Sequence, residues 1–290
     1  IEACASSHYW SRELTRMGHT VHIIPPKFVK PYLRGNKNDA NDAEAICEAI
    51  SRPAMRFVAV KTERQQTLQA EHRVRARVIK SRTALCNEIR GFLGEFGVVL
   101  PVGISQLRKA LPEILSQQEQ WDDRFMRLLC ELAEELRMLD DRVAGHDRRL
   151  AEAAREDICI QRLMKIEGIG VITASAMVAL LGDATQFKNG REMAAYVGLV
   201  PRQHSSGGKQ QLGHISKRGD SYLRTLVIHG ARSVLKTCAG KEDRRSQWLQ
   251  SVAERRNRNI ATVALANKNV RIAWAVMSRG EDYHGSRVAG

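Results

Sequence analysis

The chain has 290 residues, of which 43% are hydrophobic, so it is long enough to bury a core and to hold two or three domains. Its 46 lysines and arginines face 32 aspartates and glutamates, which leaves a formal net charge of +14. A surplus of this size indicates a polyanionic partner, nucleic acid before membrane, with a merely basic soluble protein as the plain alternative.

Cysteine and histidine spacing disfavours a zinc site and a disulfide framework. The six cysteines contain no CxxC pair and the nine histidines no HxxxH pair. This pattern fits reduced thiols in the cytosol. The longest apolar run, 171–181, is too short to cross a bilayer.

Residues 1–61 predict an α/β segment. β-branched and apolar composition favours two short strands, the first of which ends at a pair of prolines. An asparagine and an aspartate offer N-caps for the second helix, and acids in its first turn suit the helix dipole. The expected elements are a helix at 11–17, a strand at 20–24, a helix from Asn38 or Asp39 to Ile50, and a strand at 57–60.

Residues 62–155 predict two long helices, the first at about 62–96. Apolar residues recur every three, four or seven positions in both, and those of the second helix follow a heptad pattern that only His146 breaks. Two such helices form either an internal antiparallel hairpin or a coiled-coil surface through which the chain self-associates. Arginines on the other face of the first helix are either solvated or lie along nucleic acid.

Residues 156–283 predict a third, helical unit. The segment 166–171, Ile-Glu-Gly-Ile-Gly-Val, resembles the turn of a helix–hairpin–helix. In such a turn the free amides near Gly168 and Gly170 would meet DNA phosphates, and a plain helix–helix turn is the alternative. Further helices are expected at 171–181, 191–197, 221–235 and 246–277.

A glycine-rich basic stretch at 198–224 has little apolar periodicity, so it predicts an ordered loop and not a helix or a strand. Its Ser-Ser-Gly-Gly turn, 205–208, lets the backbone approach a ligand, and the flanking cations supply charge for phosphates. A serine hydroxyl there could bind a phosphate or attack one, and a solvated basic loop is the alternative. The flanking residues are Arg202, His204, Lys209, Lys217, Arg218 and Arg224.

Asp39 and Asp42 are three residues apart at a predicted helix start. Their carboxylates share one face and could hold one hard cation, Mg²⁺ or Mn²⁺. Glu2 could join them only through a tertiary contact. Helix capping and solvation are the ordinary explanations for such a pair.

The motifs taken together resemble one family. They are Glu-Ala-Cys at 2–4, Asn-Asp-Ala-Asn-Asp-Ala at 38–43, the long helical hairpin, Ile-Glu-Gly-Ile-Gly, and the stretches GLVPRQHSSGGK and GHISKRGDSYLR. The combination is similar to the DEDD transposases of insertion sequences, relatives of the Piv DNA invertase and described as bridge-RNA-guided recombinases. The resemblance covers essentially the whole chain.

The resemblance implies three domains. A partial ribonuclease-H-like (RuvC-like) domain would occupy 1–61, a coiled-coil helical hairpin 62–155, and a helical C-terminal transposase domain 156–283. The fold class is therefore α/β plus all-α. The first aspartate of the family's acid set would lie on a strand upstream of Ile1, so the expectation is a chain that begins inside its first domain with an incomplete acid set.

The resemblance also implies the site residues. Glu2, Asp39 and Asp42 would be the catalytic acids and metal ligands, and Ser206 the nucleophile, with Ser205 as the close alternative. Ser206 would form a covalent phosphoserine link to DNA while the metal polarises the phosphate. The implied partners are insertion-sequence ends, target DNA, a guide RNA and further copies of the chain, and the implied location is the bacterial cytoplasm, in association with the nucleoid. The alternatives are a RuvC-like nuclease that hydrolyses with water, and a non-catalytic nucleic-acid-binding protein.

Overall fold

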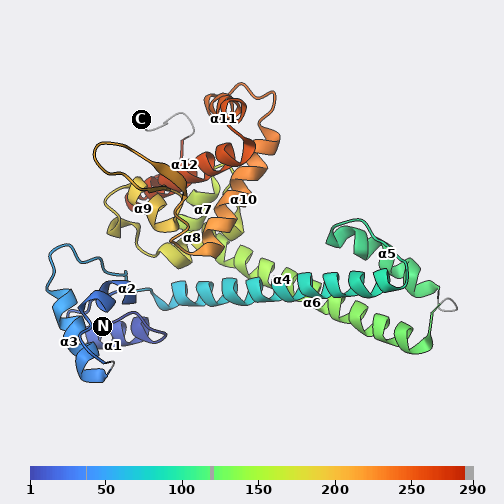
Figure 1. Ribbon diagram of the computed structural model, residues 1–290, viewed down its shortest axis with the longest axis horizontal. Helices are drawn as coiled ribbons and strands as arrows, with labels where there is room; N and C mark the ends of the chain where they lie inside the picture. The colour runs from blue at the N-terminus through green and yellow to red at the C-terminus, as the bar shows by residue number, and fades with distance from the viewer. Residues whose placement is uncertain (37, 118–120, 285–290) are drawn as a thin grey trace. The chain divides into compact units, whose positions relative to one another are not determined.

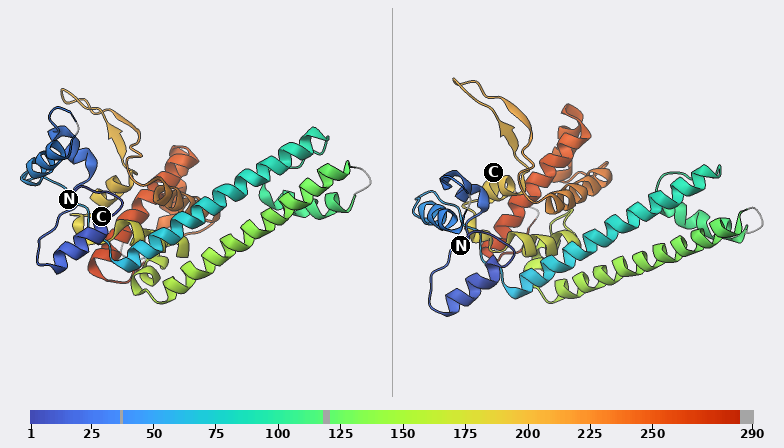
Figure 2. Two further views of the ribbon diagram at one scale, coloured as in Figure 1. Left: turned by 90° about the horizontal axis from the view of Figure 1, so that it is seen from below. Right: turned by 60° about the horizontal axis from the view of Figure 1, so that its bottom comes forward.

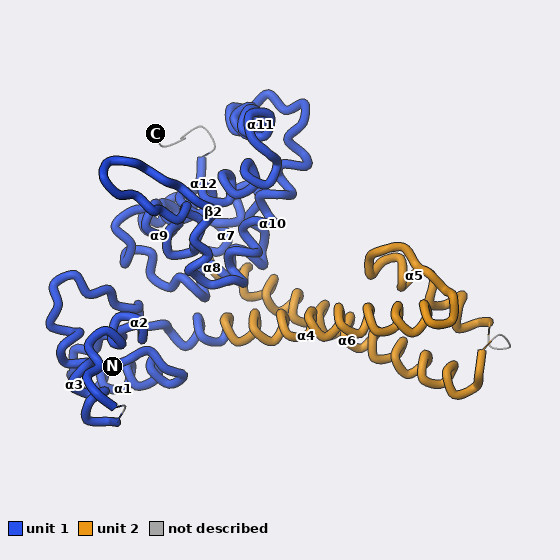
Figure 3. Tube along the Cα trace, in the orientation of Figure 1, with its two compact units in different colours: residues 1–67, 159–290 blue, residues 68–158 orange. Residues whose placement is uncertain are grey.

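The computed structural model describes residues 1–36, 38–117 and 121–284 (Figure 1). The chain forms two compact units (Figure 3). We call residues 68–158 the hairpin unit, and residues 1–67 together with those from 159 onward the main unit. No helix among the described residues is long and apolar enough to span a membrane.

The first 67 residues contain α1 (Ser7–Arg16), α2 (Pro26–Val29), the short helix η1 (Lys30–Tyr32) and α3 (Asp39–Ile50). The predicted cap of α3 is confirmed, because the Asn38 side chain accepts a hydrogen bond of 2.8 Å from the backbone amide of Asn41. Acids then occupy its first turn, where the helix dipole favours negative charge.

The two short strands expected at 20–24 and 57–60 were wrong as strands. Only isolated bridges form there, a parallel one between Glu2 and Ile24 and an antiparallel one between Ile23 and Val58. Ile23 and Ile24 are buried, as the apolar composition predicts. The prolines at 25 and 26 begin α2 directly after Ile24, so the extended segment ends before a ladder can develop.

The hairpin unit consists of most of α4 (Glu63–Glu95), α5 (Ile104–Ser116) and α6 (Asp123–Arg155). Figure 2 shows α4 and α6 side by side. They run antiparallel, because ion pairs join Arg75 to Asp147 at 2.5 Å and Arg82 to Asp140 at 3.0 Å, so that residue numbers rise along one helix as they fall along the other. Within one chain, the heptad residues therefore form an internal pair.

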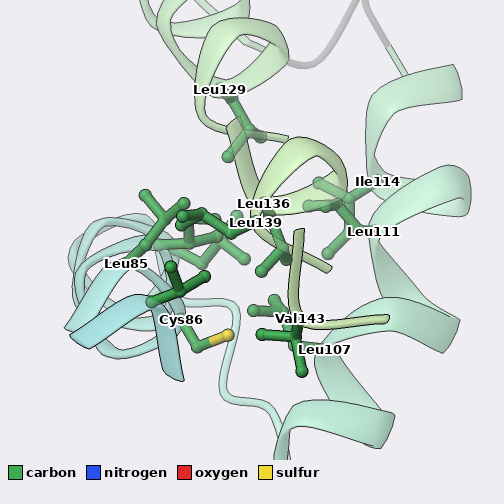
Figure 4. Close-up of a cluster of buried hydrophobic side chains, with 12 residues drawn as sticks. Leu85, Cys86, Leu107, Leu111, Ile114, Leu129, Leu136, Leu139 and Val143 are labelled. Atoms are coloured by element: carbon green, nitrogen blue, oxygen red, sulfur yellow. The ribbon is translucent and has the colours of Figure 1, made fainter. Parts of the chain in front are cut away.

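Leucine, isoleucine and valine side chains from all three helices form the core of this unit (Figure 4). Ile89 of α4 and Leu129 of α6 are completely buried in it. Helix α5 was not predicted, yet Leu107, Leu111 and Ile114 recur at the spacing of one helical face and cover the α4–α6 pair.

The main unit continues with short helices around α8 (Val171–Leu181), which is buried on nearly every side. The remaining elements are α7 (Ile158–Met164), η3 (Ala184–Gln186), α9 (Gly190–Val197), β1 (Pro201–Gln203), β2 (Leu212–Ile215), α10 (Ser221–Thr237), α11 (Arg244–Arg255) and α12 (Arg258–Arg279). Helices were expected at the positions of α8, α9 and α10, and the structure has them there.

The single helix expected over 246–277 was wrong. The chain breaks between α11 and α12, where Asn257 adopts an extended backbone and its side chain accepts a 2.9 Å hydrogen bond from the amide of Ile260. An asparagine that caps the following helix ends the preceding one, because the cap residue itself cannot be helical. Helices α11 and α12 then pack against each other instead of forming one continuous helix.

The loop expected over 198–224 was also wrong in part, since it contains β1 and β2. They pair antiparallel, with Pro201 opposite Ile215 and Gln203 opposite Leu212. Nearly every side chain of both strands is exposed. A ribbon without a buried face has no alternation of polar and apolar residues, so periodicity could not reveal it.

Candidate functional site

The serine pair lies at the tip of the β1–β2 ribbon, which extends away from the helices of its unit (Figure 2). Ser206 and Lys209 form an isolated antiparallel bridge, and the Lys209 amide donates a 3.1 Å hydrogen bond to the Ser206 carbonyl. Gly207 and Gly208 occupy the two central positions with φ of 55° and 78°. Positive φ at both positions is the requirement of a type I′ hairpin turn, which explains the two glycines.

The two serine hydroxyls differ in their contacts. Both side chains are exposed. The Ser205 hydroxyl accepts a 3.0 Å hydrogen bond from the Gln203 side-chain amide, whereas no hydrogen bond of the Ser206 hydroxyl to another described residue is found. An amide donor cannot take a proton, so the contact with Gln203 does not activate Ser205 as a nucleophile.

The base of the ribbon is tightly held against the end of α9. The Lys217 amide donates to the Gly198 carbonyl at 3.1 Å, and the Ser216 amide donates to Val200 at 2.8 Å. Lys217 itself adopts a left-handed backbone with φ of 54°, which is uncommon for a residue with a side chain. A Cβ on Gly219 would lie 2.0 Å from the Tyr196 carbonyl oxygen, so only glycine fits there.

Arg224, which is half-buried, connects the end of α9 to the base of the ribbon. Its guanidinium donates to the carbonyls of Val197 at 3.2 Å and of Gly219 at 3.0 Å. These contacts give Arg224 a structural role that its predicted phosphate contact did not include. Lys217 and Arg218, in contrast, are exposed.

The ribbon spreads the predicted cations along its length. Lys209 lies beside Ser206 at the tip, and Arg202 and His204 lie on or next to β1. Lys217 and Arg218 follow β2 at the base, and five residues of extended chain separate the base from Ser206, or about 16 Å. Of the predicted cations, Lys209 is the one whose backbone pairs with Ser206.

The predicted acids occupy the first part of the chain. Asp39 is exposed and Asp42 half-buried in the first turn of α3, and Glu2 is half-buried at the bridge to Ile24. Among the described residues, no three histidines, cysteines, aspartates or glutamates form a group that could hold a metal ion. Two carboxylates on one helical turn still fit Mg²⁺, which keeps water ligands and takes phosphate oxygens.

The glycine turn between α7 and α8 packs against α10. Gly168 has φ of 85°, and a Cβ on Gly230 of α10 would lie 1.8 Å from the Gly168 carbonyl oxygen. Close backbone approach accounts for Gly168, whereas Gly170 is exposed just before α8, whose first amides have no partner within the helix. Of the two glycines predicted to bind DNA, Gly170 has the more accessible position.

Sequence reasoning missed a buried network that holds this turn. The Arg245 side chain is almost fully buried and donates to the Glu167 carbonyl at 2.9 Å and to the Asn269 side-chain oxygen at 2.6 Å. Asn269, completely buried, donates to the same carbonyl at 3.0 Å. One arginine among many carries no sequence signal for such a role.

Family models match most of the chain. Residues 1–97 match a DEDD transposase model of the IS110 type, and residues 160–247 match the transposase IS116/IS110/IS902 family. The first match covers the acids and α3, and the second covers the glycine turn and the serine ribbon. The class of protein defined in this way is a transposase with a DEDD, ribonuclease-H-like amino-terminal domain.

Relatives that match along nearly the whole of this chain are also transposases. A probable family 20 transposase of Pseudomonas aeruginosa is 55% identical over 98% of this chain and 84% of its own length. The transposase for insertion sequence element IS1111A of Coxiella burnetii is 46% identical over 98% and 78%, respectively. The transposase for IS1328 of Yersinia enterocolitica is 40% identical over 97% and 83%.

The chain belongs to the IS116/IS110/IS902 family of transposases, and DNA transposition is its function. The predicted resemblance to insertion-sequence DEDD transposases is confirmed. The names of these relatives say nothing about the Piv invertase, a serine nucleophile or a guide RNA, so those parts of the expectation stay predictions.

Proposed function

We propose that this transposase cuts and rejoins DNA through a covalent link between Ser206 and a DNA phosphate. The observation that carries the proposal is the position of Ser206 at the exposed tip of a cationic ribbon, where its hydroxyl has no hydrogen bond to another described residue. The Ser205 hydroxyl is already hydrogen-bonded to Gln203, which favours Ser206 of the two.

In the proposed step, the Ser206 hydroxyl oxygen bonds to phosphorus and the bond from phosphorus to one deoxyribose oxygen breaks. The serine proton passes to the departing oxygen. Lys209 lies beside the serine and would offset charge that develops on the phosphate oxygens. The phosphoserine bond keeps the energy of the broken linkage, so a second DNA end can later displace the serine.

Asp39 and Asp42, with Glu2 as a third candidate, are proposed to hold Mg²⁺ or Mn²⁺ beside the reacting phosphate. When bound, such an ion polarises the phosphate and so favours attack on phosphorus. The supporting observation is that Asp39 and Asp42 share the first turn of α3. The residues themselves supply oxygen ligands and draw the ion to the amino-terminal domain.

The serine proposal is tested by trapping the adduct. The wild-type protein, incubated with a labelled insertion-sequence end and Mg²⁺, should give a protein–DNA band that survives denaturing electrophoresis. Ser206→Ala should abolish this band and leave DNA binding unchanged, whereas Ser205→Ala, its matched control, should keep it. A wild-type protein that cleaves without any adduct would indicate a nuclease that hydrolyses with water.

The acid proposal is tested with isosteric amides. Asp42→Asn should lower cutting by at least about 100-fold, because a metal site loses a charged ligand. Glu44→Gln, two residues further along α3, removes the same charge and should change cutting less than about twofold. Full cutting by Asp42→Asn would leave Asp39 and Asp42 as residues that only favour the helix start.

We also propose a guide RNA as a partner, on the basis of the family resemblance and the net charge of +14. Ribonuclease treatment of the purified protein should then abolish site-specific cutting, and added RNA should restore it. Cutting that ribonuclease leaves intact would exclude an RNA requirement.

Self-association through the hairpin unit is proposed from exposed apolar residues on α6. Leu128 and Met138 are 41% and 57% exposed, although both lie on α6, which contributes to the core of this unit. Light scattering should give a multiple of the 32.6 kDa mass. The double variant Leu128→Glu, Met138→Glu should have the mass of a monomer in the same measurement.

A further inference from the structure

The helices α11 and α12 carry an extreme excess of positive charge. Between residues 244 and 279 there are eight cations and a single carboxylate, Glu254. The cations are Arg244, Arg245, Arg255, Arg256, Arg258, Lys268, Arg271 and Arg279. All of α12 and most of α11 lie beyond residue 247, where the family match ends, so that match assigns nothing to them.

Lys268 stands at the centre of these charges. Its ammonium nitrogen lies over the Trp248 ring of α11, 4.5 Å from the ring centroid. Both side chains are half-buried between the two helices. The indole thereby fixes the position of the ammonium group, because a cation is attracted to the face of an aromatic ring.

The neighbours of Lys268 are cations as well. Burial lowers the pKa of Lys268, and the charges of Arg245, Arg244 and Arg271 lower it further. Among the described residues no salt bridge pairs Arg244, Lys268 or Arg271 with a carboxylate, whereas Arg245 lies 3.5 Å from Glu167. Arg244 lies one helical turn from Trp248 on α11, and Arg271 lies one turn from Lys268 on α12. In the described part of the chain, no carboxylate is paired with these three cations to offset their repulsion.

We propose that Arg244, Lys268 and Arg271 bind backbone phosphates of duplex DNA, through α11 and α12 and not through residues of the serine ribbon. A phosphodiester is the anion that such a group of donors fits, since arginine and lysine both form charge-assisted hydrogen bonds to phosphate oxygens. Arg245 is not part of this surface, because its guanidinium is committed to Glu167 and Asn269.

The aromatic residue of the cluster favours duplex over single-stranded DNA. Sites for single strands use free aromatic faces on which unpaired bases stack. Here the Lys268 ammonium covers one face of Trp248, and the ring is half-buried. The surface consequently offers charge in place of a stacking platform, which suits a paired backbone.

Such a surface would hold DNA while the reaction takes place elsewhere. The inference uses the family's action on DNA but does not depend on Ser206 as the nucleophile. A variant of the surface should thus weaken binding and leave adduct formation intact once DNA is saturating.

The experiment measures duplex binding by fluorescence anisotropy over a range of salt concentrations. Lys268→Met keeps an unbranched stem over Trp248 and removes the charge. If the ammonium contacts one phosphate, the slope of log K against log salt should fall in magnitude by about 0.9, and affinity at 0.1 M salt should fall by about eightfold. Arg244→Gln, whose side chain is exposed and not required for packing, should give a similar loss.

Arg279→Gln is the matched control, because it removes one exposed positive charge from the last turn of the same helix. It should change affinity less than about twofold and leave the salt slope unchanged. At saturating DNA, Lys268→Met should still give the Ser206 adduct. Circular dichroism melting curves establish that each variant is folded.

Three results would overturn the proposal. One is a salt slope that neither Lys268→Met nor Arg244→Gln changes. Another is an equal loss of affinity in Arg279→Gln, which would indicate a response to net charge alone. The third is a loss confined to single-stranded DNA or RNA probes while duplex binding stays at the wild-type level.

Discussion

His72, at the scale of a single residue, connects the packing of the hairpin unit to pH. Its side chain is 1% exposed in α4. Burial, followed by the charge of Arg75, lowers its pKa from 6.5 to about 4, although Glu71 acts in the opposite direction. The folded protein therefore keeps His72 neutral at a pH where the unfolded chain binds a proton.

The pKa of His72 predicts loss of stability in acid. Its contribution is fully present above pH 6.5 and is lost as the pH falls towards 4, and a difference of this size is worth about 3 kcal/mol. The melting temperature of the wild type should fall between pH 7 and 4.5, and His72→Leu should reduce that fall. His19→Leu, at an exposed histidine, is the control and should follow the wild type.

Glu71 adds a second contribution with the same direction. Burial alone would raise its pKa, but hydrogen bonds from His146 and Arg149 outweigh this effect and lower it. A carboxylate with a lowered pKa stabilises the fold above its unfolded pKa and less as the pH falls. The acid loss that remains in His72→Leu is therefore expected to shrink further when Glu71→Gln is added. A wild-type melting temperature that stays constant in acid would contradict both assignments.

Close helix packing, at the scale of an element, predicts opposite effects for the same substitution at two helical glycines. Alanine in a helix interior is favoured over glycine by about 1 kcal/mol. At Gly230, however, the new Cβ would lie 1.8 Å from the Gly168 carbonyl oxygen, so that backbone must move. Gly230→Ala should cost about 3 kcal/mol or more, because displaced backbone outweighs helix propensity.

Gly91 of α4 provides the comparison, since a Cβ there would meet nothing within 4 Å. Gly91→Ala should raise stability by about 0.5 to 1 kcal/mol. Chemical denaturation followed by circular dichroism measures both effects. Stabilisation by Gly230→Ala would show that α10 and the glycine turn are not in close contact in solution.

Helix positions were predictable where local signals act alone. The start of α3 follows from Asn38 and two early acids, and α4 and α6 follow from apolar spacing. Asn257 carries the same kind of capping signal, but the apolar residues on both of its sides predicted one long helix. The structure has two helices there, α11 and α12, which pack against each other.

The net charge of +14, at the scale of the whole molecule, predicts steep salt dependence of DNA binding. Each duplex phosphate contacted should add about 0.9 to the slope of log K against log salt, because counterions leave the DNA when protein cations replace them. Binding titrations between about 50 and 200 mM salt measure the slope. A flat response would exclude contacts to the DNA backbone as the main source of affinity.

The sequence by itself determined the family, the long helices and the candidate chemistry at Ser206 and Asp42. These rest on local patterns, namely caps, apolar periods and a motif that extends over many consecutive residues. The exposed ribbon was hidden because neither of its faces is buried, so its pairing comes from the Gly207–Gly208 turn and backbone hydrogen bonds.

Only the tertiary structure decided which charged residues are used within the fold. Arg224 and Arg245 look like their neighbours in the sequence, yet the guanidinium of each donates hydrogen bonds to the backbone of its own chain. Lys268 is held over Trp248 among other cations, and no salt bridge to a carboxylate is found for it among the described residues. The physical reason is that a side chain's role depends on the groups that burial places around it, and residues far apart in the sequence supply those groups.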